Sequence, residues 1–334
     1  MPGARASMKA LVLRGRTAAL EEIAAPRCKQ PDDVVVGVAV AGVCRTDCYL
    51  ATGQMAATTP AATPLVLGHE LAGVVREAGP ASGFEPGERV ACMPLLGCGQ
   101  CAPCRAGRAH VCPHGQMLGL DRDGGFAERV RVPASALGRV PAGLSLRHAA
   151  FAEPVAAALA VPEALTDAWT DASTEASADA ARANQGLILG QGRIATLTAR
   201  VLAARGFGQV QIRPVPERVD ASDADAFDFV VETSATERSF AAALALLKPR
   251  GTLVLKSRPP WLVALDVVGC VRKELRLVGA YYGSLAAALD LMHTRAIEVD
   301  DLLGPGHALA DHQAVFAAEL AGDEARKQFF VMGD

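Results

Sequence analysis

Three side chains on two short segments could together bind a catalytic metal ion. Cys44 lies in the segment 42–47, and His69 and Glu70 end the segment 64–70. A thiol, an imidazole and a carboxylate are ligand types that zinc prefers, and three of them leave a fourth position open for water or substrate. The alternative is structural, because a cysteine is often simply buried and a lone histidine often belongs to the core. Taken by themselves, these three residues leave both interpretations open.

A second cluster, of four cysteines, favours zinc. Two, two and seven residues separate Cys98, Cys101, Cys104 and Cys112, and glycines lie between and beside them. The backbone can therefore fold tightly enough to direct four sulfur atoms at one centre, which predicts a closed structural zinc site. The nine cysteines of the chain could form disulfides only in an oxidising compartment. Because the segment 1–7 lacks the apolar run of a signal peptide, we expect a cytoplasmic protein with reduced thiols.

Length and composition set the class of protein. The 334 residues are 51% hydrophobic and 21% charged, with a formal net charge of -3. A chain of this length can bury a sizeable core and is expected to form two domains. Because neither sign of charge dominates, we predict neither nucleic acid nor a membrane surface as a partner, and expect a small-molecule substrate. No apolar run reaches the roughly 18 residues of a membrane span.

The elements that must position the two cysteine-containing segments read as short β-strands. Gly, Pro or Asp turns bound each of them, which is typical of a barrel-like all-β unit. The expected strands are 9–13, 33–40, 71–75, 88–92 and 127–132.

From Ala149 onward the sequence becomes helical and rich in alanine. Glu153 and Pro154 open an expected helix that runs toward Leu165. The segment 166–184 is low in complexity and could be a helix or a surface insertion. Its small polar residues cannot bury much area, so we predict the surface insertion.

A glycine-rich turn between a strand and a helix indicates a nucleotide site. The strand 186–189 precedes Gly190-x-Gly192-x-x-Ala195, and an amphipathic helix follows to Arg205. The first glycine permits the tight turn, the second lets a pyrophosphate approach the backbone, and the small third residue lets the helix pack on the strand. Strands at 210–212, 227–231, 251–255 and 275–278 and a helix at 237–247 predict a doubly wound parallel sheet, before a last helix at 285–293 and strand at 328–331.

Taken together, these motifs resemble the zinc-containing medium-chain dehydrogenase/reductase superfamily, the relatives of alcohol, sorbitol and threonine dehydrogenases. The segment 42–47, the Gly68-His69-Glu70 stretch, the four-cysteine lobe and Glu153-Pro154 occur in that family's order and approximate spacing. The resemblance implies a GroES-like catalytic domain over 1–154 with a structural zinc lobe at about 96–113. It implies a Rossmann domain over 155–283, a return to the catalytic domain over 284–334, and an active site in the cleft. The fold class would be α/β with a β-rich domain.

The resemblance also implies roles for single residues. Cys44, His69 and Glu70 look like ligands of a catalytic zinc, and Glu153 looks like a carboxylate that ligates the metal or exchanges with its water. Thr46 resembles the hydroxyl that passes the substrate proton outward.

Two charged neighbours of Thr46 have implied roles as well. Asp47 resembles the carboxylate that supports a metal-binding imidazole. Arg45 resembles a pyrophosphate contact, for which a guanidinium fork is suited. The alternative is that both charges belong to a solvated turn. The cofactor implied by Gly190 and Gly192 is a nicotinamide dinucleotide.

The chain departs from the family pattern in three places. Tyr49 stands where many relatives have a relay histidine, and a phenol is a poorer proton store. Pro214 falls about where NAD-dependent relatives place the acidic ribose ligand, whereas Arg213 could pair with a 2′-phosphate, so we predict NADP(H). The segment 214–226 is too short for the usual helix and short strand, so one crossover is expected to be trimmed.

The function predicted from these features is zinc-dependent oxidation of an alcohol, secondary or polyhydroxylated, or reduction of its carbonyl, with hydride transfer to or from a nicotinamide. The resemblance implies two zinc ions per chain and a homodimer or homotetramer. An alternative from another class is a redox-neutral lyase or cyclase whose degenerate nucleotide site holds no working cofactor. A catalytically inactive, zinc-stabilised binding protein is a third interpretation, which the full set of ligand types disfavours.

Overall fold

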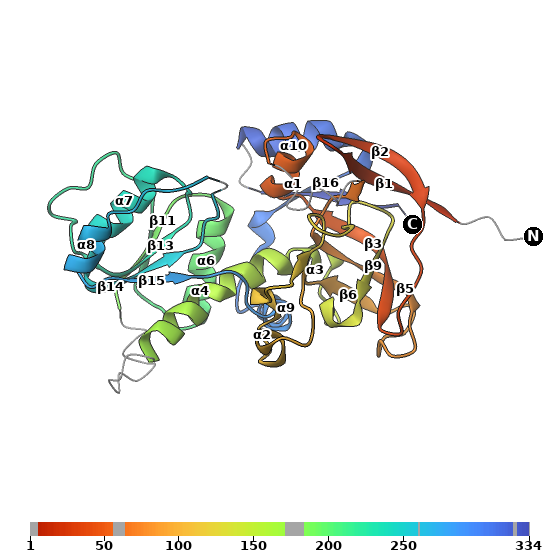
Figure 1. Cartoon of the computed structure of the whole chain (residues 1–334), viewed down its shortest axis with the longest axis horizontal. Helices are drawn as coiled ribbons and strands as arrows, with labels where there is room; N and C mark the ends of the chain where they lie inside the picture. Colours follow the sequence, from red (N-terminus) through yellow and green to blue (C-terminus); the bar gives the residue numbers. More distant parts are fainter. Residues whose placement is uncertain (1–5, 56–63, 171–183, 260, 323–325, 334) are drawn as a thin grey trace, which may run out of the picture. The chain divides into compact units, whose positions relative to one another are not determined.

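The computed structural model divides the chain into two compact units (Figure 1). The first comprises Met1–Glu153, Leu285–Thr294 and Val299–Asp334, and the second comprises Pro154–Ser284 and Arg295–Glu298. Each unit has hydrophobic clusters of its own. The structure describes residues 6–55, 64–170, 184–259, 261–322 and 326–333.

Antiparallel strands form most of the first unit, as its short apolar segments predict. The strands of its two larger sheets are β1 (Ser7–Arg14), β2 (Thr17–Ala24), β3 (Asp33–Gly42), β4 (Leu65–Val66), β5 (Glu70–Ala78), β6 (Arg89–Cys92), β9 (Arg129–Pro133), β10 (Leu137–Arg139), β16 (Leu303–His307) and β17 (Lys327–Val331).

These strands pair in the orders β2-β1-β4 and β10-β6-β5-β3-β17-β16, and β9 also pairs with β3. Strand β3 is the centre of the unit, and its run of Val and Ala is buried on both faces. Aromatic rings fill the core beside it, where Phe126 and Phe330 meet edge to face at 4.9 Å between centroids. The segment 327–331 therefore contributes a strand next to β3 although it is far away in sequence.

Short helices and turns connect the strands of the first unit. They are α1 (Arg45–Ala51), α3 (Leu146–Ala150), α9 (Leu285–His293), α10 (His312–Ala321) and the 3-10 turns Ala134–Ala136, Asp300–Leu302 and Leu309–Asp311. The cysteine lobe contains β7 (Leu95–Leu96), α2 (Ala102–Arg105), the 3-10 turn Ala109–Val111 and β8 (Gln116–Met117).

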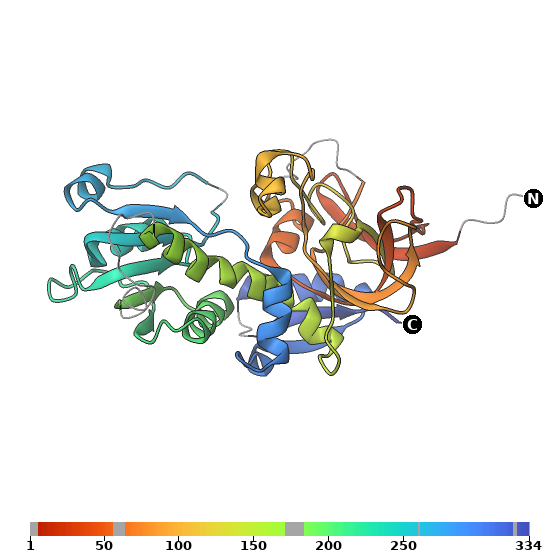
Figure 2. The same cartoon turned by 90° about the horizontal axis from the view of Figure 1, so that it is seen from below.

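The second unit is a parallel sheet with helices on both faces (Figures 1 and 2). Its elements are β11 (Gly186–Leu189), β12 (Val210–Arg213), β13 (Phe227–Glu232), β14 (Leu247–Leu255), β15 (Arg276–Gly279), α4 (Ala152–Thr170), α6 (Arg193–Ala204), α7 (Glu237–Leu246) and α8 (Val267–Arg272). Their order is β12-β11-β13-β14-β15.

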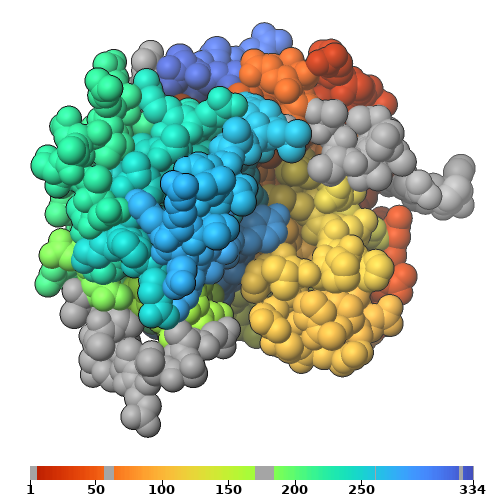
Figure 3. Space-filling model, turned by 60° about the vertical axis from the view of Figure 1, so that its left-hand side comes forward, coloured from red at the N-terminus to blue at the C-terminus, as the bar shows by residue number. Residues whose placement is uncertain are grey.

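Alternation along β11 explains the two helical layers. Ile188 belongs to the cluster that α4 and α6 cover, whereas Leu187 and Leu189 belong to the cluster that α7 covers. The short helix α8 lies at the surface, shown in blue in Figure 3. The predicted fold class, a β-rich unit combined with a doubly wound parallel sheet, is confirmed.

Several predicted boundaries were wrong for reasons of packing. Residues 166–170 continue α4 rather than joining a surface insertion, because Trp169 packs edge to face against Phe229 at 5.8 Å. The predicted segment from 171 to 183 lies outside the described residues. Leu247 belongs to β14 and not to the preceding helix, since it pairs with Phe227 of β13.

The link between β12 and β13 contains neither helix nor strand, as its length predicts. Among the helices of the described residues, none is long and apolar enough to cross a membrane.

Candidate active site and metal centres

The fold brings Cys44, His69 and Glu70 together. Their candidate ligand atoms all lie within 4.8 Å of one another. Strands β3 and β5 produce this arrangement, because Gly42 at the end of β3 faces Glu70 at the start of β5 and Cys44 follows two residues later. Gly68 adopts a φ of 96° to make the turn before His69, and a Cβ there would stand 2.5 Å from the Phe126 ring.

The Asp47 carboxylate contacts both segments that carry the candidate ligands. Its Oδ1 lies 3.1 Å from Nδ1 of His69 and accepts from the Gly68 N–H at 3.2 Å, and its Oδ2 accepts from the Cys44 N–H at 3.0 Å. Burial lowers the pKa of His69, but the charge and hydrogen bond of Asp47 and the Cys44 thiol outweigh it and raise that pKa well above its ordinary value. With Nδ1 held by Asp47, Nε2 is the nitrogen left for a metal.

Glu70 has an ion-pair partner that sequence reasoning missed. The Lys327 ammonium lies 2.5 Å from Oε1 of Glu70 and donates to the Val43 carbonyl at 3.0 Å, and both side chains are buried. The second carboxylate oxygen, Oε2, is buried without a hydrogen-bond partner among the described residues. A buried carboxylate oxygen without a partner, in a residue that lies close to a thiol and an imidazole, fits a divalent cation.

Lys327 also changes the charge of the site. One thiolate and one carboxylate would neutralise Zn²⁺, but the ammonium restores one positive charge beside the carboxylate. A less neutralised zinc polarises a bound oxygen more strongly. A lysine in the apolar strand 327–331 could have signalled this role, because lysine is almost never fully buried unless it is paired.

The other predicted residues of the first unit take varied places. Thr46 Oγ1 lies 3.7 Å from the Cys44 sulfur. Tyr49 is half-buried and Arg45 is exposed. Glu153 is buried at the start of α4 but does not belong to the group formed by the three candidate ligands. Its role as a ligand therefore stays a prediction.

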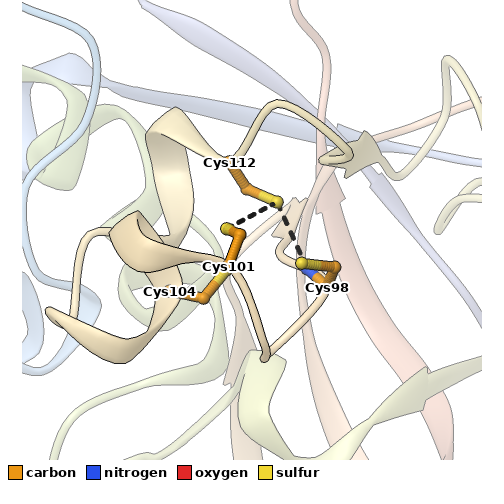
Figure 4. Close-up of side chains that lie close together, drawn as sticks. All are labelled: Cys98, Cys101, Cys104 and Cys112. Carbon is orange, nitrogen blue, oxygen red and sulfur yellow. Dashed lines mark hydrogen bonds between the residues drawn. The ribbon is translucent and has the colours of Figure 1, made fainter.

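The four cysteines of the lobe face one another (Figure 4). Their sulfur atoms all lie within 4.8 Å of one another, and the Cys101 and Cys112 sulfurs are 3.6 Å apart. Gly97 is required for this approach, because a Cβ there would stand 2.7 Å from the Cys104 sulfur. All nine cysteines are free thiols.

Local backbone chemistry prepares the lobe for a cation. The N–H groups of Gln100 and Cys101 lower the pKa of Cys98 to about 6, which favours its thiolate. No residue between 97 and 113 is buried, so the lobe has no apolar core to hold its shape. The donor set and the geometry fit a structural zinc ion.

The predicted glycine-rich turn lies at the carboxyl end of β11. Gly190 and Gly192 have φ values of 138° and 94°, and a Cβ on Gly190 would stand 2.3 Å from Thr233 Oγ1. Gly192 is the N-cap of α6, and Ala195 is fully buried in the first turn of that helix. These features suit a pyrophosphate at the helix N-terminus.

Arg213, which is predicted to bind a 2′-phosphate, has partners within the second unit. Its guanidinium lies 3.2 Å from Asp223 Oδ2, donates to Gln211 Oε1 at 2.9 Å and stands over the Phe227 ring at 5.2 Å. Asp223, in the shortened crossover, thus pairs with the guanidinium that is predicted to bind a 2′-phosphate.

Comparisons with known proteins agree with this architecture. Residues 30–142 match the alcohol dehydrogenase GroES-like domain family. The chain is 27% identical over 315 residues to a 2-dehydro-3-deoxy-L-galactonate 5-dehydrogenase of Pseudoalteromonas atlantica, covering 86% of this chain and 88% of that protein. It is 36% identical over 151 residues to an L-threonine 3-dehydrogenase of Bacillus velezensis, covering 44% of this chain and 43% of that protein.

A solved structure extends the likeness to the whole fold. The crystal structure of a zinc-binding dehydrogenase from Sinorhizobium meliloti, bound to NADP, has a TM-score of 0.81 and 29% identity and covers 98% of this chain and 100% of that chain.

Proposed function

Because the chain belongs to the zinc-containing medium-chain dehydrogenase/reductase superfamily, we propose that it interconverts an alcohol and its carbonyl compound by hydride transfer with a nicotinamide cofactor. The observation that carries this proposal is the meeting of Cys44, His69 and Glu70, with one buried oxygen of Glu70 left open. The named relatives are dehydrogenases of a sugar acid and of threonine, which supports a small hydroxylated substrate with a secondary alcohol.

In this proposal the residues of the chain divide the work. A zinc ion bound by the three ligands would supply a Lewis acid for the substrate oxygen. Asp47 orients the His69 ring, and Lys327 holds one oxygen of Glu70 so that the other faces the metal. Thr46 would take the substrate proton and pass it outward, with the Tyr49 hydroxyl as a further carrier. Glu153 would act as an exchangeable carboxylate, and Arg45, Gly190, Gly192 and Ala195 would bind the cofactor.

Zinc stoichiometry tests the two proposed metal sites. We expect elemental analysis of active protein to find two zinc ions per chain, one held by the Cys44 site and one by the lobe. The reduced thiols that both sites require suit the cytoplasm as the proposed location. Fully active protein with fewer than two equivalents of zinc would contradict the assignment.

The cofactor proposal is a preference for NADP(H), supported by Arg213 and by the NADP bound to the Sinorhizobium meliloti neighbour. A guanidinium–phosphate contact contributes on the order of 1.5 to 3 kcal/mol, which is roughly ten- to a hundredfold in affinity. Because Asp223 competes for that guanidinium, we expect Asp223→Ala to tighten NADPH binding and Arg213→Ala to weaken it. Neither change should alter NADH binding by a comparable factor.

Calorimetric titration of the wild type and both variants with NADPH and NADH measures these effects. Arg250→Ala, which removes an exposed arginine that also pairs with a carboxylate, is the control for net charge. If wild-type protein binds NADH more tightly than NADPH, the phosphate argument is wrong.

We also propose a homodimer, or a homotetramer built from such dimers. Strand β15 ends the described sheet of the second unit, and exposed apolar side chains lie on the segment before it. Leu262 is 97% exposed and Val271 is 70% exposed. A second copy of the chain would cover this apolar surface.

Light scattering should give at least twice the mass of one chain. The double variant Val267→Asp with Val271→Asp should lower the measured mass. A monomeric wild type would refute the proposal.

A further inference from the structure

A cavity in the first unit lies apart from both candidate metal centres. It has a volume of about 820 Å³ and is bounded by the start of β1, the end of β2 with the loop after it, β4, the segment 122–124 and β9. None of the candidate zinc ligands lines it. Its volume falls within the usual range for small-molecule sites.

Positive charge dominates the walls of this cavity. Its lining includes the cations Arg27, Lys29, Arg122, Arg129 and Arg131, set against only two carboxylates. The chain as a whole carries a formal net charge of -3, so the positive charge of this lining is opposite in sign to the net charge of the chain. A concave surface with one sign of charge focuses the field and raises the local concentration of ions of opposite sign.

The two carboxylates of the cavity are already bonded to the backbone. Asp123 accepts from the Val66 N–H at 3.0 Å, and Glu77 accepts from the Cys28 N–H at 3.1 Å. Neither of them, in the part of the chain that the structure describes, forms an ion pair with a cation of the lining. Among the described residues, no carboxylate forms an ion pair with Arg27 or Lys29.

The arginines of the segment 122–124 and of β9 differ in their ion pairing. Neither Arg122 nor Arg129 has an ion-pair partner among the residues that the structure describes. Arg131 lies 3.6 Å from Asp33, a carboxylate that also accepts from the N–H groups of Lys29 and Gln30. Four cations, on three separate segments of the lining, therefore have no ion-pair partner among the described residues.

Hydrogen-bonded strands form part of the cavity's backbone. Strand β1 pairs with β2 along its full length and with β4, and β9 pairs with β3 over five residues. Met8 and Val66 belong to a buried apolar cluster beneath the cavity, against which Ile23 packs. Arg129 and Arg131 lie on the paired strand β9, whereas Arg27, Lys29 and Arg122 lie in the loops beside it.

We propose that this cavity binds a small, multiply charged oxyanion, of which a sugar bisphosphate is the best match. The fork of an arginine pairs two N–H groups with the oxygens of one phosphate or carboxylate. Several cations carried by separate segments of the lining suit a ligand with more than one anionic group. The concave shape and the net negative charge of the chain disfavour a membrane surface or a nucleic acid.

Calorimetry on the full-length, zinc-loaded protein tests the proposal, with fructose 1,6-bisphosphate, citrate and inorganic phosphate as probes at fixed ionic strength. Wild-type protein should bind a multiply charged probe more tightly than inorganic phosphate. Tighter binding of the bisphosphate than of citrate assigns the phosphate source, and the reverse assigns the polycarboxylate. Arg122→Ala with Arg129→Ala should weaken binding by about tenfold or more.

A second variant, Arg27→Ala with Lys29→Ala, tests the loop after β2 and covers failure of the first variant to fold. Arg14→Ala, an exposed arginine of the same unit that pairs with Glu21, controls for net charge, and Arg213→Ala controls for binding at the nucleotide site. Both controls should bind as the wild type does. Lack of binding to every probe at millimolar concentration, or loss of binding in Arg213→Ala with retention in both cavity variants, overturns the proposal.

Discussion

Replacing Cys44 with serine is expected to abolish turnover and leave the fold intact. The residue is half-buried and lies at the N-cap of α1, so an alcohol of similar size fits, but serine is a poor ligand for zinc. Loss of the Lewis acid removes several kcal/mol of transition-state stabilisation, roughly a thousandfold or more in rate. Steady-state turnover and zinc content measure the effect, and we expect one zinc ion per chain to remain.

Cys101→Ser is the matched change in the lobe. It should lower the stability of the protein, whereas Cys44→Ser should remove turnover. No residue between 97 and 113 is buried, so the metal must supply the folding energy of this segment. We expect a lower melting temperature and aggregation. Cys270→Ser, in the second unit and in neither metal group, should change neither property. Full turnover in Cys44→Ser, or wild-type stability in Cys101→Ser, would show that the two centres are misassigned.

Replacing Lys327 with methionine is expected to destabilise the metal-free protein far more than the zinc-loaded protein. Removing one partner of a buried ion pair leaves a charge uncompensated and typically costs about 3 to 5 kcal/mol. In metal-free protein Glu70 would become that charge. Zinc bound to the same carboxylate would neutralise it, so part of the loss should return when zinc is added.

Urea unfolding of metal-free and zinc-loaded Lys327→Met gives the two free energies of unfolding. Lys327→Arg should restore most of the stability because it keeps the positive charge. Lys248→Met, which removes a lysine that pairs with Asp228 at a half-exposed site, should cost much less. An equal loss with and without zinc would mean that Glu70 does not face the metal.

Local patterns were predictable from the sequence, and long-range pairings were not. The four cysteines fall within fifteen residues, so their spacing alone restricts their geometry. The strand, glycine turn and helix at 186–204 form a contiguous unit as well. Glu70 and Lys327, in contrast, are 257 positions apart, and the pairing of β3 with both β17 and β5 brings them together.

The same limit explains what was not foreseen in the second unit. Nothing near Arg213 predicts that Asp223 will turn back to meet it, because the segment between them has no regular structure. Trp169 extends α4 because its ring packs against Phe207 and Phe229, which are distant in sequence. At residues 166–170, tertiary packing therefore favours a helix although the local composition predicts a surface insertion.

The most direct test of the central claim is the absorbance of the reduced nicotinamide during turnover. Zinc-loaded wild-type protein is incubated with NADP⁺ or NAD⁺ and a panel of secondary alcohols and sugar acids, with Cys44→Ser as the blank. Hydride transfer predicts that the absorbance rises in step with the carbonyl product, and that it falls when NADPH and the carbonyl are supplied instead. Conversion of a substrate without any change in this absorbance would contradict the oxidoreductase and favour a redox-neutral reaction.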